Sequence, residues 1–400
     1  MLLNAADKAL WRLALPMIFC NITVPLLGLV DTAVIGHLDS PVYLGGVAVG
    51  ATATSFLFML LLFLRMSTTG LTAQAWGAKD PQRLARALVQ PLALALGAGV
   101  LIILLRLPLI DLALHIVGGS EAVLEQARRF LEIRWLSAPA SLANLVLLGW
   151  LLGVQYARAP VILLVVGNLL NIVLDLWLVM GLRMNVQGAA LATVTAEYAT
   201  LIIGLLMAKR VLTLRGVSLA MLKNAWRGDL RRLLALNRDI MLRSLLLQLC
   251  FGALTVFGAR LGSDIVAVNA VLMTMLTFTA YALDGFAYAV EAHSGQAYGA
   301  RDGSQLLEVW RAACRQSGMV ALAFALIYSL AGQYIIALLT SLPSLQQLAD
   351  RYLIWQTILP VVGVWCYLLD GMFIGATRGA EMRNSMAVAA AGFAVTLLTV

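Results

Sequence analysis

Long apolar stretches alternate with short polar segments along the whole chain. Each apolar stretch has close to the roughly 20 residues that an α-helix needs to cross the hydrocarbon core of a bilayer. The stretches are rich in leucine and alanine and lack the alternating polarity of barrel strands, so they indicate helices. The pattern therefore predicts an all-α polytopic membrane protein. We place eleven spans at 11–35, 44–64, 87–110, 131–154, 160–181, 187–208, 240–261, 266–290, 317–339, 352–375 and 385–400.

The chain also contains an internal repeat. Gln-Ala-Trp-Gly-Ala-Lys-Asp at 74–80 returns as Gln-Ala-Tyr-Gly-Ala-Arg-Asp at 296–302, an offset of 222 residues. A duplicated hydrophobic chain is a recurring architecture of secondary transporters, in which the substrate path lies between the two repeats. The repeat therefore favours a transporter. One pair of glycines recurs at the same offset, since Gly149 and Gly153 in the first half correspond to Gly371 and Gly375 in the second.

The longest polar interruption, residues 209–239, separates the first six predicted spans from the rest. Because six is even, both halves enter the membrane in the same direction and form two six-helix lobes as parallel repeats. We predict an N-lobe at 1–210, a cytoplasmic linker at 211–238 and a C-lobe at 239–400. A second lobe as long as the first would run past Val400, so we expect twelve helices, with the last one or so missing from this chain.

Composition agrees with a membrane protein and explains the basic charge. The chain is 62% hydrophobic and 12% charged, whereas soluble domains have about 25% charged residues. With the N-terminus inside, twenty Lys and Arg residues fall on the inner side and seven on the outer side, leaving Arg65 within the second span. This is the positive-inside bias of membrane proteins. The net charge of +8 therefore indicates orientation in the membrane, and no nucleic-acid partner is expected.

Three spans of the first half carry polar side chains at similar predicted depths. Ionisable groups within the bilayer are unfavourable by roughly 2.5–3.5 kcal/mol on insertion scales, so each is a functional candidate. Asp31 lies near the outer end of the first span, and Thr193 lies in the sixth. Asn171 and Asp175, at positions i and i+4, share one face of the fifth. Glu197, one turn beyond Thr193, is a weaker candidate.

This set of carboxylate, amide and hydroxyl groups predicts a site for a proton shared by two acids, or for a cation bound by hard oxygen ligands. The alternative is that Asp31 lies among the lipid headgroups and that Asp175 is a structural hydrogen-bond partner.

The second half offers weaker candidates. Asp284 and Glu291 share a face of the eighth span, and Asp370 lies in the tenth. Arg243, near the inner end of the seventh span, could neutralise either aspartate, so a functional site and a structural ion pair are equal alternatives there. Glu291 lies so close to the cytoplasmic end of its span that we expect it to be solvated. Arg65 is expected to extend to the inner membrane surface.

Several motifs in order along the chain resemble those of the multidrug and toxic compound extrusion (MATE) transporters, and in particular of the bacterial branch named for DNA-damage-inducible protein F. The resemblance implies a twelve-helix antiporter with two six-helix lobes. The motifs are Leu-Val-Asp-Thr-Ala-Val-Ile-Gly (29–36), Asn-Ile-Val-Leu-Asp (171–175), Leu-Asp-Gly-Phe-Ala (283–287), Gln-Ala-Tyr-Gly-Ala (296–300) and Asp-Gly-Met-Phe-Ile-Gly-Ala-Thr-Arg (370–378).

The resemblance assigns roles unevenly to the two lobes. It matches four residues to the first-lobe proton or cation cluster of the family, namely Asp31, Asn171, Asp175 and Thr193. Asp370 matches an acid that some members use in the second lobe. The glutamate that accompanies that acid in those members has no evident equivalent here, because Arg238 and Arg243 occupy its region. The absence of this glutamate departs from the family pattern and favours proton coupling through the first lobe.

From the resemblance we predict a secondary active multidrug efflux transporter. It would exchange lipophilic or cationic compounds for protons by alternating access, as a monomer in a bacterial inner membrane with its N-terminus in the cytoplasm. The alternatives are sodium-coupled antiport and a flippase for lipid-linked precursors, which would need a strongly cationic cavity. An enzyme is not expected, because the three histidines form no catalytic motif, and neither a cofactor nor a metal site is expected.

Overall fold

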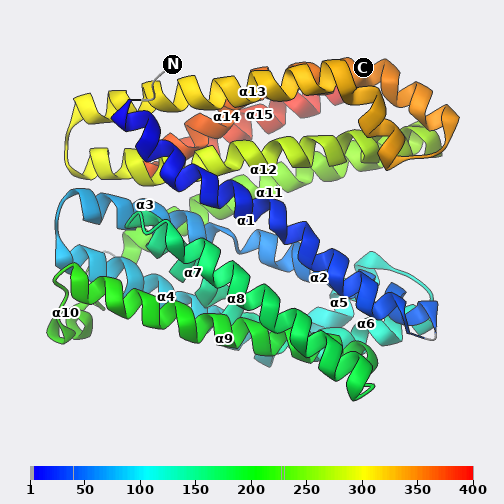
Figure 1. The fold of residues 1–400 in the computed structure, drawn as a ribbon, viewed down its shortest axis with the longest axis horizontal. Helices are drawn as coiled ribbons and strands as arrows, with labels where there is room; N and C mark the ends of the chain where they lie inside the picture. Colours follow the sequence, from blue (N-terminus) through cyan, green and yellow to red (C-terminus); the bar gives the residue numbers. More distant parts are fainter. Residues whose placement is uncertain (1–3, 39, 227, 229, 400) are drawn as a thin grey trace. The chain divides into compact units, whose positions relative to one another are not determined.

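The computed structural model describes residues 4–38, 40–226, 228 and 230–399, without the side chains of residues 24–32. Every regular element among these residues is helical, which confirms the all-α prediction (Figure 1). In chain order the elements are α1 (Ala5–Gly36), α2 (Pro41–Leu60), α3 (Phe63–Gly77), α4 (Pro81–Leu104), α5 (Arg106–Val117), α6 (Glu121–Arg134), η1 (Trp135–Ser137), α7 (Ala138–Gly153), α8 (Arg158–Asp175), η2 (Leu176–Gly181), α9 (Asn185–Leu214), α10 (Leu219–Asn224), α11 (Leu230–Leu261), α12 (Ser263–Gly299), α13 (Gly303–Leu339), α14 (Pro343–Gly375) and α15 (Gly379–Thr399).

Nine helical segments of the described residues are long and apolar enough to cross a membrane. They overlap with the second to tenth predicted spans in order. The first and eleventh predicted spans lie in α1 and α15, which are helical but are not among the nine. The segments are longer than predicted where polar residues continue a helix. The second span, for example, was expected to end near residue 64, but a break at Leu61 and Leu62 leads into α3, so the segment ends at Gly77.

The contacts divide the described residues into two compact units. The C-unit combines residues of Met1–Ile22 with residues of Ala235–Val400, and the N-unit comprises Thr23–Leu234. The predicted N-lobe, residues 1–210, contains all of α1, whereas this helix contributes its first part to the C-unit and its second part to the N-unit.

The repeated heptapeptide forms the same helix–turn–helix connection in both units. Its cation adopts a left-handed backbone conformation in each copy, with φ 53° at Lys79 and φ 54° at Arg301. The aspartate that follows caps the next helix. Asp80 accepts hydrogen bonds at 3.1 and 3.3 Å from amides in the first turn of α4, and Asp302 accepts one at 3.1 Å from α13. The sequence identity between the halves therefore corresponds to a shared turn.

The recurring glycines also have one structural role. On α7, a Cβ at Gly149 would lie 2.6 Å from the carbonyl oxygen of Arg65 on α3. On α14, a Cβ at Gly371 would lie 2.7 Å from the carbonyl oxygen of Ala287 on α12. Small residues spaced by four allow two helix backbones to approach closely in a membrane. The same close contact thus supports the N-unit between α3 and α7 and the C-unit between α12 and α14.

Candidate functional site

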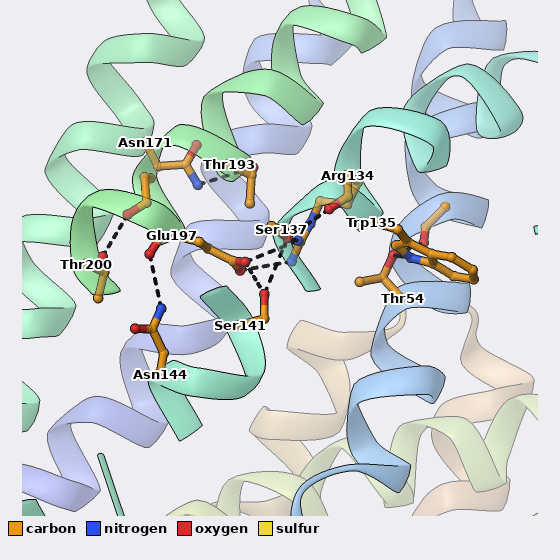
Figure 2. A network of polar contacts seen from close by, with 12 residues as sticks. Thr54, Arg134, Trp135, Ser137, Ser141, Asn144, Asn171, Thr193, Glu197 and Thr200 are labelled. Carbon is orange, nitrogen blue, oxygen red and sulfur yellow. Dashed lines mark hydrogen bonds and ion pairs between the residues drawn. The ribbon is translucent and has the colours of Figure 1, made fainter. Parts of the chain in front are cut away.

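The structure brings two of the four predicted coupling residues into contact in the N-unit, where α8 packs along α9. Asn171 on α8 donates a hydrogen bond through Nδ2 to Thr193 Oγ1 on α9, at 3.5 Å (Figure 2). Thr193 in turn donates to the carbonyl oxygen of Ala189, at 3.2 Å. Asn171 is buried, with 2% of its surface exposed. Its Oδ1 is also buried and accepts no hydrogen bond from the described residues.

Asp175 lies one turn beyond Asn171 and is the last residue of α8. Only 1% of its surface is exposed, so the acid is enclosed by protein. The backbone continues past it as a π-helical turn, η2, in which Leu182 donates to the carbonyl oxygen of Trp177 at 2.9 Å. π-Helical turns are rare in proteins overall, but those that occur often lie at functional sites. Asn171, Asp175 and Thr193 are called the N-unit polar cluster below. The side chain of Asp31, the fourth predicted member, lies outside the described residues.

Glu197, the weaker first-half candidate, lies one turn after Thr193 but forms an ion pair with Arg134. Arg134 Nη2 lies 3.1 Å from Glu197 Oε1, and the two side chains are 12% and 25% exposed. Ser141 donates a hydrogen bond to the same carboxylate. Asn144 donates to the backbone carbonyl of Glu197 at 3.2 Å. Figure 2 shows this network next to the Asn171–Thr193 contact, with Glu197 joining α9 to α6 and α7.

The sequence interpretation missed the partners of Glu197. Arg134 is one of the seven cations that the sequence assigned to the outer side, whereas the structure places it at the end of α6, inside a membrane-spanning segment that continues into α7. A signal was present in the sequence. Four polar residues recur at helical spacing through an otherwise apolar region, namely Arg134, Ser137, Ser141 and Asn144. Such a stripe indicates one polar face on a buried helix.

In the C-unit, the structure pairs the predicted acid with the expected cation. Arg243 on α11 donates to the carboxylate of Asp370 on α14, and the side chains are 16% and 25% exposed. Asp284 on α12 is half-buried. The ion pair anticipated as the alternative role of Asp370 is therefore present.

Two charged residues are less accessible than the sequence indicated. Arg65 was expected to reach the membrane surface, but it is 2% exposed and contacts Thr69 Oγ1 through Nη1 at 3.4 Å. Glu291 was expected to be solvated, but it is 1% exposed. Both corrections have one cause, since each residue lies on the helix face that packs against a glycine-rich neighbour, α7 for Arg65 and α14 for Glu291. Hydropathy along one helix does not reveal such a neighbour.

The chemistry of the N-unit polar cluster is that of an oxygen-rich site inside a membrane-spanning region. It offers a carboxylate, an amide oxygen with unused acceptor capacity and a hydroxyl. These groups can hold a proton or bind a hard cation. Among the described residues, no three His, Cys, Asp or Glu side chains gather in a group that could hold a metal ion.

The MatE family model matches residues 16–177 and again residues 240–399, once in each half. The chain belongs to the MatE family. It is 87% identical over 397 residues to DNA damage-inducible protein F of Escherichia coli K12, covering 99% of this chain and 86% of that protein. It is 22% identical to the probable multidrug resistance protein NorM of Acinetobacter baylyi, covering 90% of this chain and 80% of that protein. The family and the branch inferred from the sequence motifs are therefore confirmed.

A solved structure has the same fold. It is an outward-facing multidrug resistance MATE family transporter of the MOP superfamily, and it superposes with a TM-score of 0.81 at 24% sequence identity. The superposition covers 96% of this chain and 85% of the other. The chain is thus a multi-pass membrane protein with the fold of a transporter family.

Proposed function

We propose that the protein is a secondary active exporter that exchanges lipophilic or cationic compounds for protons across a bacterial inner membrane. The relatives named above as multidrug resistance proteins support the substrate class. The observation that supports coupling in the N-unit is the enclosure of Asp175 beside the Asn171–Thr193 contact. An acid inside a membrane-spanning segment is unfavourable by roughly 2.5–3.5 kcal/mol. A structural role alone does not require an acid at this position, so its presence favours a functional role.

In the proposed cycle, a proton binds the N-unit polar cluster when the transporter is open to the outside. Proton uptake removes the negative charge of Asp175, and the protonated carboxyl group can donate a hydrogen bond, which the carboxylate cannot. A cationic substrate loses its electrostatic attraction to the site at the same step, so substrate leaves as the proton enters. Alternating access then requires that proton and substrate favour different conformations of the two repeats.

The η2 turn gives the site a local element that can respond to this change of charge. A π-helical turn has longer-range backbone hydrogen bonds than the α-helix on either side. Because η2 follows Asp175 directly, a shift of the carboxyl group acts first on this irregular backbone. Asp31 would be the second acid of the site, as the family resemblance implies, and would couple the same proton to α1.

The test uses the purified protein in proteoliposomes with a fluorescent lipophilic cation such as ethidium. Export is driven by an imposed pH gradient, and substrate counterflow without a gradient is measured in parallel. We expect Asp175→Asn to reduce gradient-driven export at least tenfold while counterflow persists, because the amide cannot take up the proton. Asp111→Asn is the matched control, since Asp111 is an exposed acid paired with Arg128.

Each other outcome changes a specific part of the proposal. Full gradient-driven export by Asp175→Asn would remove this residue from coupling. Export that follows an imposed sodium gradient and ignores pH would change the coupling ion. A lack of export of any cation, together with transfer of a labelled lipid-linked precursor, would replace the exporter by a flippase.

A further inference from the structure

A basic pocket in the N-unit is separate from the polar cluster. It has a volume of about 40 Å³ and is partly open to solvent. Its cations are Arg83 and Arg86 from the start of α4 and Arg232 from the start of α11. Leu71 and Leu233 add apolar surface, and no carboxylate lines the pocket among the described residues. Three arginines therefore line the pocket without an acidic side chain in the lining.

The pocket is held in place by hydrogen bonds to the linker. Gln90 is 5% exposed, and its Nε2 donates to the carbonyl oxygens of Trp226, at 3.3 Å, and Gly228, at 2.8 Å. Gly228 has φ +97°, and a Cβ there would lie 3.2 Å from Cζ of Arg86. The linker backbone thus lies directly against the guanidinium group of Arg86.

Two of the arginines differ in how their donors are used. Arg86 has an unused donor, and Arg232 is held by a buried partner. Nε of Arg86 is buried and donates to no acceptor among the described residues. Arg232 is fixed from the other side, since its Nη2 donates to Oε1 of buried Gln74 at 3.1 Å. Arg83 lies one turn from Arg86 on the same face of α4. Like charges held close together repel each other, and an anion that accepts hydrogen bonds from all three would offset that repulsion.

We propose that this pocket binds the phosphate headgroup of an anionic phospholipid. Arginine is suited to phosphate because its planar donors can bind two phosphate oxygens at once. Basic pockets between membrane helices on the cytoplasmic side are typical sites for lipid headgroups.

The surroundings favour a lipid over free phosphate. α4 is a membrane-spanning segment that begins at Pro81, only two residues before Arg83. Apolar side chains next to the cations are strongly exposed, at 62% for Trp226, 51% for Leu230 and 47% for Leu234. Exposed tryptophan and leucine beside cations are typical of the membrane–water interface. A headgroup in the pocket would leave its acyl chains beside these apolar residues.

The experiment is native mass spectrometry of the purified protein in detergent, titrated with dioleoylphosphatidylglycerol or with dioleoylphosphatidylcholine. We expect the wild type to prefer the anionic lipid, and Arg83→Gln/Arg86→Gln to weaken its binding at least tenfold. Arg231→Gln is the matched control, because Arg231 is an exposed neighbour of Arg232 that does not line the pocket. Its affinity should stay within twofold of the wild type.

Equal affinity of the double variant and the wild type for phosphatidylglycerol would overturn the proposal. Inorganic phosphate that binds with the same arginine dependence, without any preference for the anionic lipid, would make this a free-anion site and would overturn the lipid assignment. If the double variant does not fold, Arg83→Gln alone tests the same contact. The titration needs no transport, so its outcome is independent of the proposed export function.

Discussion

The Arg134–Glu197 ion pair joins α6 to α9 next to the N-unit polar cluster. Removing one partner leaves the other charge poorly solvated, whereas removing both takes away the charge as well as the attraction. We expect Glu197→Gln to lower the free energy of unfolding by about 1–3 kcal/mol. The double variant Arg134→Gln/Glu197→Gln should be less destabilised than the sum of the two single variants. Thermal unfolding of the purified protein measures all three.

Additive effects of the two substitutions would contradict this prediction, because additivity means that the side chains do not interact. The surface pair Arg128–Asp111 provides a control in the same unit, since its side chains are 43% and 61% exposed. Exposed pairs contribute about 0–1 kcal/mol, so Asp111→Asn should change stability little.

Asp7, before the first predicted span, gives the C-unit a pH-dependent contact. Burial raises the pKa of Asp7, but hydrogen bonds from Arg315, at 3.0 Å, and from the amide of Asn4, at 3.2 Å, outweigh this effect, so the pKa is lowered. A lowered folded-state pKa contributes stability above the unfolded value, and this contribution is lost as pH falls through the folded value.

We therefore expect the melting temperature of the wild type to fall relative to that of Asp7→Asn between about pH 5 and about pH 3. Scanning fluorimetry across this range measures the difference. A constant difference between the two proteins at every pH would show that the carboxylate charge of Asp7 does not stabilise the fold.

Sequence reasoning predicted some side-chain contacts and not others. Asn171 and Thr193 could be paired because hydropathy gives the bounds and direction of their two helices. Counting residues from the end of each helix then gives the depth of each side chain in the membrane. Arg65, Arg134 and Glu291 could not be placed, because a polar residue near the end of an apolar run reads the same whether lipid headgroups or another helix surround it. Their burial follows from the neighbouring helices, which hydropathy does not encode.

At the level of helices, hydropathy predicted those boundaries that a polar segment marks and missed a helix that is itself rich in charge. The starts of α8 and α9 lie within two residues of the predicted spans, because the flanking segments are polar and short. α6 was largely missed, since Glu121–Arg134 contains many charges and reads as a loop. It is nevertheless helical and packs against α2 and α9, which bury its apolar face.

The two glycine contacts predict that a larger residue at either position disrupts helix packing. Gly371→Ala would place a Cβ 2.7 Å from a backbone carbonyl oxygen on α12, and Gly149→Ala would place one 2.6 Å from a carbonyl on α3. Backbone atoms cannot move aside as a flexible side chain can, so the helices must separate. We expect each variant to lower the melting temperature and the yield of folded protein, with a loss of about 1–3 kcal/mol in stability.

Gly363→Ala is the matched control on α14, because a Cβ there meets no atom within 4 Å. Alanine is the better helix former by about 0.8–1.0 kcal/mol, so this variant should be neutral or slightly more stable. If Gly371→Ala behaved like Gly363→Ala, the close approach of α12 and α14 would not be a feature of the folded protein.

For the whole molecule, the repeat predicted from the sequence is supported by structure, since both halves share the Asp-capped turn and the glycine contact. The charges do not follow the repeat. An offset of 222 relates Asp370 to Leu148, so the acid of the Arg243–Asp370 pair has no acidic counterpart in the first half. The two halves thus share their close-packed scaffold but differ in their charged groups. Because Asp370 is paired with Arg243, its charge is already compensated within the C-unit.

The distribution of charge predicts how the whole chain is oriented in the membrane. Lys and Arg gather at the N-terminus and in residues 209–239, which the positive-inside rule assigns to the cytoplasm. The connection at Gly118–Ser120, between α5 and α6, should then face the opposite side. Alkaline phosphatase is active only outside the cytoplasm, and green fluorescent protein exported in unfolded form fluoresces only inside it. A phosphatase fusion after Gly118 should therefore be active, and a fluorescent fusion after Gly216 should be bright.

The reciprocal fusions are the control, because each reporter should be silent at the other site. If the phosphatase were active after Gly216 and inactive after Gly118, the N-terminus would lie outside and the basic pocket would face the wrong leaflet for a cytoplasmic headgroup. Two silent reporters at one site would instead show that the fusion protein had not accumulated. The reciprocal design therefore separates a reversed topology from loss of the fusion protein, which a single silent reporter would confuse.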